Sequence, residues 1–390
     1  MIPAAPRLRF PEFKDPWKPG HAGDAFKNSR AKGAAGLPIY SVTMDRGLVR
    51  RDSMDRHMAA DAADGQNLRA QRGDVVYNMM RMWQGAVGLA PEECMVSPAY
   101  VVLSPKKHTS PQFFDQWFKG KRMLYLLGAY SHGITSDRLR LYADDFARIP
   151  LHLPSLPEQQ KIAVFLGAVD AKLAALATKQ AALGRFKAGL MQKLFSQQIR
   201  FKRDDGGAFP DWEELPFEKI ASRGRSAFNP QKLKDRPTLI ELENIESGTG
   251  KIVGHSDLDG QISLKSTFRT GDVLFGKLRP YLRKYARPNF DGVCSSEIWV
   301  LHGRKVSNAF LFYLVQSSLF IQVANISTGS KMPRSDWATI ADTGFEIPHP
   351  DEQAKIADAL SAMDAKIQTV ADQLARLQTF KKGLLQQMFV

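Results

Sequence analysis

The chain contains one long stretch twice, and this repeat limits its possible folds more than any other feature. Residues 158–196 align with residues 352–390 at a constant offset of 194 and without a gap, and 19 of the 39 pairs are identical. Both copies begin Glu-Gln-x-Lys-Ile-Ala, continue through Asp-Ala-Lys and contain Phe-Lys-x-Gly-Leu near their ends. Identity at about half of the positions excludes chance, so we interpret the chain as an internal duplication.

Apolar residues recur every seven positions inside each copy, with a second set four residues further on. This a/d spacing over about four heptads predicts two long helices. A core-facing helix would carry a wider and shorter stripe, so we expect the two helices to pair as an antiparallel coiled coil. The predicted helix-pairing residues are Ile162, Val169, Leu176, Leu183 and Leu190 in the first copy and Ile356, Met363, Val370, Leu377 and Leu384 in the second.

The charge of the chain indicates an anionic partner. There are 54 Lys and Arg residues against 40 Asp and Glu residues, a formal charge of +14. Such an excess is most often associated with nucleic acid. Two cysteines, Cys94 and Cys294, argue against a disulfide scaffold or a cysteine-ligated zinc site. The first residues lack the apolar segment of a signal peptide, and the apolar run 310–324 is too short to span a bilayer. We therefore expect a cytoplasmic protein with no membrane contact.

The repeat extends beyond the helices to the whole half-chain. The Arg9-Phe10 segment returns as Arg200-Phe201, and the strand-like Gly73–Tyr77 returns as Gly271–Phe275. The run 112–127, predicted to be one helix, corresponds to 310–324. The sequence therefore predicts an α+β protein with a pseudo-two-fold internal repeat. Its parts are a recognition domain over 1–152, a helix over 153–197, a second recognition domain over 198–346 and a second helix over 347–390.

At this point the residues resemble a family, the specificity subunits of Type I restriction-modification systems. The resemblance rests on the duplicated Glu-Gln-x-Lys-Ile-Ala helices, the Arg-Phe-Pro-Glu-Phe tag at 9–13 and the segment 271–281. It covers essentially the full chain, and the duplicated order of motifs is more specific than any single motif. The second tag departs from the pattern, because Lys202–Gly207 is inserted before Phe209.

The resemblance implies two target-recognition domains, each reading half of a split sequence in double-stranded DNA. It also implies partners: two methyltransferase subunits, and restriction subunits that act as translocase and nuclease, all docked through the long helices. The chain itself would then be a non-enzymatic recognition subunit without a cofactor. S-adenosylmethionine, ATP and Mg²⁺ would be bound by the partner subunits.

Motifs for catalysis by this chain are weak or missing. There is no phosphate-binding loop and no Gly-rich cofactor loop after a strand, and Asn229-Pro230-Gln231 lacks the aromatic residue of an adenine methyltransferase loop. Asp351 and Asp364 with Lys366 form the nearest nuclease-like pattern. These residues belong to the second predicted helix, where 13 positions separate the carboxylates by about 20 Å. We interpret them as exposed or docking residues rather than a metal site.

Basic loops are the better candidates for function. The segment 277–287 carries five basic residues with two tyrosines between them, and it follows a predicted strand. Such a loop can place ammonium and guanidinium groups on phosphates and on guanine edges. The predicted DNA-binding residues are Arg81, Trp83, Gln84, Arg138, Lys277, Arg279, Tyr281, Arg283, Lys284, Lys331 and Arg334.

Within this set we predict that Arg279 contacts a base and Lys284 a phosphate, because a planar fork suits guanine and a flexible ammonium suits a phosphate. Two other functions stay open from the sequence alone. One is a Mg²⁺-dependent DNA nuclease that uses the helix carboxylates. The other is a coiled-coil scaffold whose globular modules bind proteins.

Overall fold

The computed structural model describes residues 5–54, 66–135, 137–224, 226–231, 236–326 and 332–389. The chain forms two compact units, which are described separately. Unit 1 contains residues 1–178 and 371–390, and unit 2 contains residues 179–370. Two long helices, α5 (Leu156–Phe195) and α10 (Pro350–Gln387), each contribute to both units. Each unit therefore contains the start of one long helix and the end of the other.

Unit 1 is built on two four-stranded sheets and a two-stranded ribbon. The first sheet has the order β2 (Phe26–Ser29), β9 (Tyr100–Pro105), β6 (Val75–Asn78) and β7 (Val87–Leu89), with all neighbours antiparallel. The second has the order β4 (Gly47–Arg50), β3 (Ile39–Thr43), β8 (Cys94–Val96) and β5 (Leu68–Ala70), in which β3 and β8 are parallel. The ribbon pairs β1 (Lys18–His21) with β10 (Pro150–Leu153).

The central strand β6 shows why the first sheet of unit 1 is covered on both faces. Val75 and Tyr77 belong to the main core with the helices, whereas Val76 belongs to a smaller cluster with β3, β5 and β8 residues. Side chains alternate between the faces of a strand, so one apolar strand serves two cores. Its three buried residues, Val75, Val76 and Tyr77, are consequently all aliphatic or aromatic.

The helical part of unit 1 differs from the predicted single helix over 112–127. The chain forms α2 (Pro111–Trp117) and α3 (Lys121–Ala129), with Gly120 in an extended conformation between them. Ser110 begins α2 by accepting a hydrogen bond from the Phe113 amide. Apolar residues continue at helical spacing on both sides of this break, so the pattern predicted a single helix. The remaining short elements are α1 (Ala22–Ala25), α4 (Ala143–Ala147) and the 3₁₀ turns η1 (Arg51–Ser53) and η2 (Met82–Gln84).

Unit 2 repeats much of this strand topology. Its first sheet has the order β12 (Ala221–Arg223), β19 (Ile298–Gly303), β16 (Val273–Gly276) and β17 (Tyr285–Ala286). Its second has the order β13 (Ala227–Phe228), β15 (Lys265–Phe268), β18 (Gly292–Cys294) and β14 (Thr238–Ile240), with β14 and β18 parallel. A ribbon pairs β11 (Glu213–Pro216) with β20 (Gly344–Ile347). The second sheets differ at one edge, since β4 pairs with β3 but β13 pairs with β15.

The apolar run 310–324 was predicted to be one buried helix, and it forms two. These are α7 (Asn308–Leu314) and α8 (Ser318–Ala324), each begun by a serine whose hydroxyl accepts a backbone hydrogen bond. Ser317 is extended, and this conformation ends the first helix. Unit 2 also contains α6 (Phe217–Ile220), α9 (Trp337–Asp342), η3 (Leu242–Asn244) and η4 (Pro280–Leu282).

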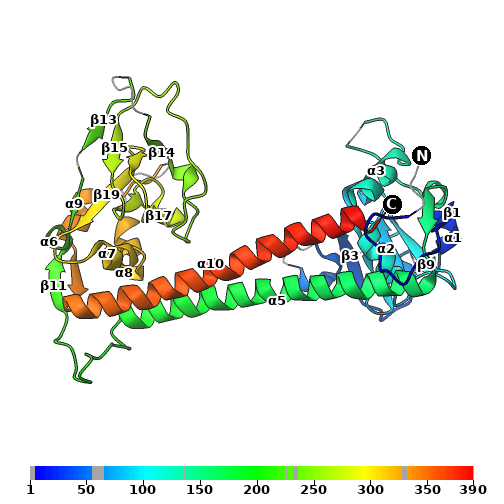
Figure 1. Ribbon diagram of the computed structural model, residues 1–390, viewed down its shortest axis with the longest axis horizontal. Helices are drawn as coiled ribbons and strands as arrows, with labels where there is room; N and C mark the ends of the chain where they lie inside the picture. The colour runs from blue at the N-terminus through cyan, green and yellow to red at the C-terminus, as the bar shows by residue number, and fades with distance from the viewer. Residues whose placement is uncertain are drawn as a thin grey trace. The chain divides into compact units, whose positions relative to one another are not determined.

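The long helices are packed into the core of each unit. In unit 1, Ile162 and Leu166 of α5 share a core with Leu384 of α10. In unit 2, α7 and α8 lie beside the first turns of α10 (Figure 1), and Ile356 and Leu360 join their core. The ten predicted helix-pairing residues are all at least partly covered. Six are buried (Ile162, Val169, Leu176, Ile356, Val370 and Leu384) and four are half-buried (Leu183, Leu190, Met363 and Leu377).

Candidate nucleic-acid interface

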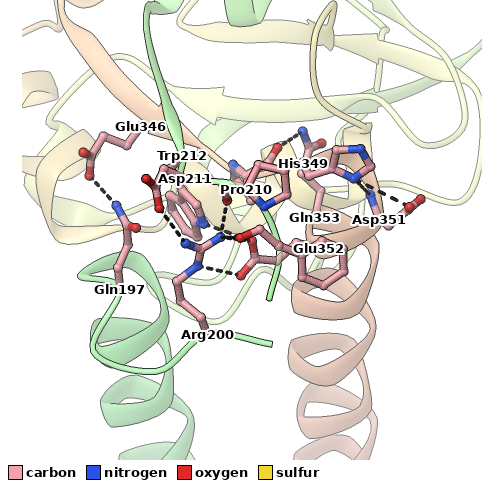
Figure 2. Close-up of polar contacts among 12 residues, drawn as sticks. Gln197, Arg200, Pro210, Asp211, Trp212, Glu346, His349, Asp351, Glu352 and Gln353 are labelled. Carbon is pink, nitrogen blue, oxygen red and sulfur yellow. Dashed lines mark hydrogen bonds and ion pairs between the residues drawn. The ribbon is translucent and has the colours of Figure 1, made fainter. Parts of the chain in front are cut away.

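A buried carboxylate at the start of α10 holds the tag of unit 2 in place. Glu352 is fully buried and accepts hydrogen bonds from Arg200 Nε at 3.2 Å, Arg200 Nη2 at 2.8 Å and Trp212 Nε1 at 3.2 Å (Figure 2). Arg200 Nη2 also donates to the carbonyl oxygen of Pro210. The hydrogen bond to Glu352 raises the pKa of Arg200. One charged pair thus fixes both ends of the segment 200–212 on the helix.

Unit 1 contains the same arrangement at the start of α5. Glu158 is buried and accepts from Arg9 Nε at 2.6 Å, Arg9 Nη2 at 2.8 Å and Trp17 Nε1 at 3.2 Å. The hydrogen bond to Glu158 raises the pKa of Arg9. The sequence contains the signal for this contact, because Arg, Trp and Glu occur in both halves at similar spacing. The tags and the helix starts are each visible in the sequence, but the contact between them was not predicted.

The glutamine after each buried carboxylate connects the helix to a neighbouring helix cap. Gln159 Oε1 accepts from the amide of Ser110 at 2.9 Å, and Gln353 Oε1 accepts from the amide of Ser307 at 3.3 Å. Ser110 and Ser307 are the N-caps of α2 and α7. The Glu-Gln pair therefore fixes the tag and the first helix of each module to the same helical turn.

The insertion in the second tag is a turn that supplies a further contact. Lys202 and Ala208 form an isolated bridge across it. Asp204 accepts a hydrogen bond from Lys355, which lowers the pKa of that carboxyl group. In unit 1 the matching Lys161 contacts Glu12, a residue of the uninterrupted tag. The insertion therefore supplies the acidic partner from a different position of the chain.

The turn after β16 presents the basic residues of unit 2. It contains η4, and the residues at its two ends, Arg279 and Arg283, have left-handed backbone conformations with φ of 51° and 52°. Pro280 is buried, whereas Arg279, Arg283 and Tyr281 are exposed, the tyrosine by 54%. No hydrogen bond or ion pair of the Arg279 guanidinium is found within the described residues.

The two predicted basic loops of unit 2 lie next to each other. The amide of Arg279 donates to the Pro333 carbonyl at 2.8 Å, and the amide of Ser335 donates to the Lys277 carbonyl at 2.8 Å. Arg334 pairs with Glu297 at 3.0 Å, and this contact raises the pKa of Arg334. Lys331 lies outside the described residues. The structure thus joins two segments that the sequence separates by about fifty residues.

Lys284 has a structural position that does not fit its predicted contact with phosphate. Its side chain is half-buried, and its ammonium donates to the carbonyl oxygens of Leu242 at 2.6 Å and Ile245 at 2.7 Å. Reaching a phosphate would leave both carbonyls without this donor. Arg283, by contrast, makes one long contact, from Nη2 to the carbonyl oxygen of Gln316 at 3.4 Å.

Unit 1 has a corresponding turn after β6. Arg81 Nη1 contacts Gln84 Oε1 at 3.2 Å, and the Trp83 indole donates to the Met80 carbonyl at 3.2 Å. Both Arg81 and Gln84 are exposed, and Gly85 after the turn has φ of 92°. Arg138 is also exposed, in a segment that returns to this turn through the bond from the Leu141 amide to the Met79 carbonyl.

A groove of about 1400 Å³ lies beside the turn in unit 2. It is bounded by the end of α5, the start of α10 and the loop 246–251, and Arg283 and Arg287 are on its wall. Asp364 also lines the groove, but it already accepts from Lys187 at 2.6 Å and from the Tyr313 hydroxyl at 2.9 Å. These contacts make Asp364 part of the packing between the helices and α7.

The suspected nuclease carboxylates are not gathered into a metal site. Among the described residues, no group of three or more His, Cys, Asp or Glu side chains is arranged to hold a metal ion. In that same part of the chain, no helix is both long and apolar enough to cross a membrane.

Comparison with known proteins agrees with this fold and its two similar units. The family model for the Type I restriction modification DNA specificity domain matches residues 21–185 and 242–379, more than half of the chain. The chain therefore belongs to the Type I DNA specificity domain family. This confirms the resemblance drawn from the duplicated helices.

Relatives and solved structures give the same picture. The specificity subunit of the Type I restriction enzyme EcoDI from Escherichia coli is 26% identical over 281 residues, 63% of this chain and 62% of its own length. That of MjaVIII from Methanocaldococcus jannaschii is 22% identical over 265 residues, 62% of this chain and 61% of its own length. The matches thus span less than two thirds of these relatives.

Two solved structures share the fold over nearly the full chain. The S subunit of a Type I restriction-modification system from M. genitalium has a TM-score of 0.56 at 13% identity and covers 99% of both chains. A chain from a study of assembly and conformational transition of a Type I system has a TM-score of 0.57 at 14% identity and covers 96% of this chain and 97% of its own. Both support a mixed α and β fold with long helices.

Proposed function

We propose that the chain is the DNA sequence-specificity subunit of a Type I restriction-modification complex and reads a bipartite target in double-stranded DNA. Each unit supplies one reader, and the two readers recognise different half-sites. The observation that carries this proposal is the repeated architecture. The first sheet has the same strand order in both units, and its third strand is followed by a 3₁₀ turn that contains an aromatic residue and is preceded by an exposed arginine. The excess of positive charge supports an anionic partner.

The candidate reading residues are those predicted from the sequence, with the exception of Lys284. In unit 1 they are Arg81, Trp83, Gln84 and Arg138, and in unit 2 they are Lys277, Arg279, Tyr281 and Arg283, with Lys331 and Arg334 from the second basic loop. Guanidinium forks and amides are suited to base edges in the major groove, and aromatic rings to apolar contact. We assign Lys284 to holding the turn together rather than to DNA, because its ammonium is bound to two carbonyls.

The long helices are proposed to pair as an antiparallel coiled coil and to form the docking surface for other subunits. Support comes from the heptad pattern and from one cross-helix ion pair in each unit, Lys381 with Asp170 and Lys187 with Asp364. On this proposal two methyltransferase subunits bind the helices and restriction subunits bind the assembled core. The pseudo-two-fold repeat would then match the two halves of the target, and the predicted domain limits stay part of this proposal.

Catalysis is proposed to belong to the partners, which would bind S-adenosylmethionine, ATP and Mg²⁺. The role of this chain is then to position a methyltransferase at a chosen adenine. We also propose a cytoplasmic location, where the DNA and these cofactors are available. A nuclease that uses Asp364 is disfavoured, because that carboxylate is already bound to Lys187 and Tyr313.

Module exchange tests the proposal. Residues 1–150 are replaced by the matching module of a relative, and the methylated sequence is mapped across a genome with the partner subunits present. The expected result is a change in one half of the recognised sequence, with the other half and the spacer kept. A change in both halves, or in neither, would show that the two modules are not independent readers.

A further inference from the structure

In the turn after β16, Arg283 occupies a position whose backbone conformation is unfavourable for its residue type. In unit 1 the residue after η2 is Gly85, with φ of 92°. The matching residue after η4 in unit 2 is Arg283, with φ of 52°. The left-handed conformation suits glycine and is strained for a residue with a Cβ atom. Unit 2 therefore has an arginine at a backbone position where unit 1 has glycine, the residue type that this conformation favours.

Packing within the chain does not account for this arginine. The Arg283 side chain is exposed, and its hydrogen bond to the Gln316 carbonyl is long, at 3.4 Å. Gln197 provides a contrast, since it also has a positive φ, 56°. It lies just beyond the end of α5, where a left-handed residue is ordinary, and it donates to Glu346 at 2.8 Å. Strain that no internal contact explains is typical of functional positions.

The turn that carries Arg283 is held firmly from several sides. The Arg283 amide donates to the Pro280 carbonyl at 2.8 Å, and the Arg283 carbonyl accepts from the Gly248 amide at 2.9 Å. Lys284 fastens the next position to two carbonyls. Arg279, at the other end of the turn, has the same left-handed conformation. Two guanidinium groups and the exposed ring of Tyr281 are thus presented on a fixed backbone.

We infer that Arg283 contacts DNA, and that this contact explains an arginine in an unfavourable left-handed conformation. It gives unit 2 a half-site contact that unit 1 lacks. Arg279 and Arg283 stand on either side of Tyr281. The two guanidinium forks bind phosphates or guanine edges of the half-site, while the tyrosine ring lies against the bases. This inference rests on the proposed function and specifies how one half of the target is read.

The test is Arg283→Gly in the full chain assembled with its partner subunits. Because glycine fits the left-handed conformation, the melting temperature should stay unchanged or rise by up to about 3 °C. Affinity for the specific duplex should fall by about 5- to 100-fold, the loss typical of one good arginine contact. Arg283→Lys should keep part of the salt-dependent affinity but lose sequence preference in the half-site of unit 2. If Arg283 had only a structural role, the Arg283→Gly variant would bind DNA like the wild type or would be less stable.

Two control variants separate strain from charge. Gln197→Gly removes a side chain from another residue with a left-handed backbone conformation, outside the turn, so DNA binding should not change. Arg269→Ala removes an exposed charge before β16, at the opposite end of that strand from the turn, and should also leave sequence preference unchanged. Wild-type affinity or specificity in Arg283→Gly, or a loss equal to that of Arg269→Ala, would overturn the inference and leave the proposed function standing. A wild-type complex that shows no sequence preference would overturn both.

Discussion

Lys187 of α5 donates to Asp364 of α10 at 2.6 Å, and its repeat partner Lys381 binds Asp170 in the same way. The four residues are two pairs of matching positions, since both pairs differ by the helix offset of 194. Each helix therefore carries a lysine and an aspartate at matching positions, and each of these charges meets the opposite charge on the other helix. In unit 2 the Asp364 carboxylate also accepts from the Tyr313 hydroxyl, and in unit 1 Asp170 accepts from Gln116.

Neutralising either aspartate should loosen the unit that contains it. Asp364→Asn should lower the free energy of unfolding by about 1–2 kcal/mol, because it leaves a half-buried ammonium without its counter-charge. Asp170→Asn should have a similar effect in unit 1. Denaturant titration measures both. Asp358→Asn, an exposed change on the same helix as Asp364, should be neutral. Equal effects at 358 and 364 would show that the pair adds nothing specific.

The buried carboxylates of the tags should be more sensitive. Glu352→Gln keeps the shape of the side chain but leaves the Arg200 guanidinium without a counter-charge. We expect a loss of about 2–4 kcal/mol, and the same for Glu158→Gln with Arg9. Urea midpoints would report it, with Glu346→Gln as the exposed control. If both glutamine variants unfold at the wild-type midpoint, the tags are not held by these charges.

A charge placed in the proposed seam should disrupt it. Leu176 is 7% exposed, so Leu176→Asp would bury an unpaired carboxylate and cost about 3 kcal/mol or more. The matched control is Thr178→Asp, because the second copy has Asp372 at the equivalent exposed position. Thermal melting and co-purification with the methyltransferase subunits are the measurements. A Leu176→Asp variant that melts and assembles like the wild type would contradict the coiled coil.

The long helices were the most predictable part of the fold, because heptad spacing over 39 residues leaves few alternatives. The apolar run 310–324 was not predictable in detail, since Ser317 is extended and its hydroxyl begins a second helix within the run. The role of Lys284 was predicted from its charge alone. Its actual partners are the carbonyls of Leu242 and Ile245, about forty residues earlier in the chain, and no local pattern indicates such contacts.

The two thiols should be inert while the chain is folded. Burial raises the pKa of Cys94 to about 11 and that of Cys294 to about 12. An unfolded cysteine has a pKa of about 8.5, so the native chain keeps protons that the unfolded chain loses above that pH. Stability should therefore fall as pH rises from about 8.5 toward these native values. At pH 8 a thiol reagent should label neither residue until denaturant is added, and rapid native labelling of either would contradict this burial.

The last prediction concerns the join between each helix and the tag that follows it. The Ile199 amide donates to the Lys193 carbonyl at 3.2 Å, and the Leu8 amide donates to the Gln387 carbonyl at 2.9 Å. The donors and acceptors are matching positions of the two repeats. Residues 196–198 connect α5 covalently to the tag at Ile199, whereas α10 and the tag at Leu8 belong to opposite ends of the chain. Phe389 stacks on Trp117 at 6.0 Å between ring centroids, which fixes the end of α10 within unit 1 beside α2 (Figure 1).

A circular permutant should therefore fold and function. A short linker would join the end of α10 to the tag at Leu8, and the chain would be opened near Gln197. Closing so short a gap costs little entropy, and permutation is usually tolerated at exposed junctions with close ends. Each tag keeps its carboxylate, Glu158 or Glu352, and only the order of the readers changes. With partner subunits, the permutant should methylate the wild-type sequence. A folded, soluble permutant that neither assembled nor methylated would show that a linker between α10 and Leu8 cannot replace the native connection between α5 and Ile199.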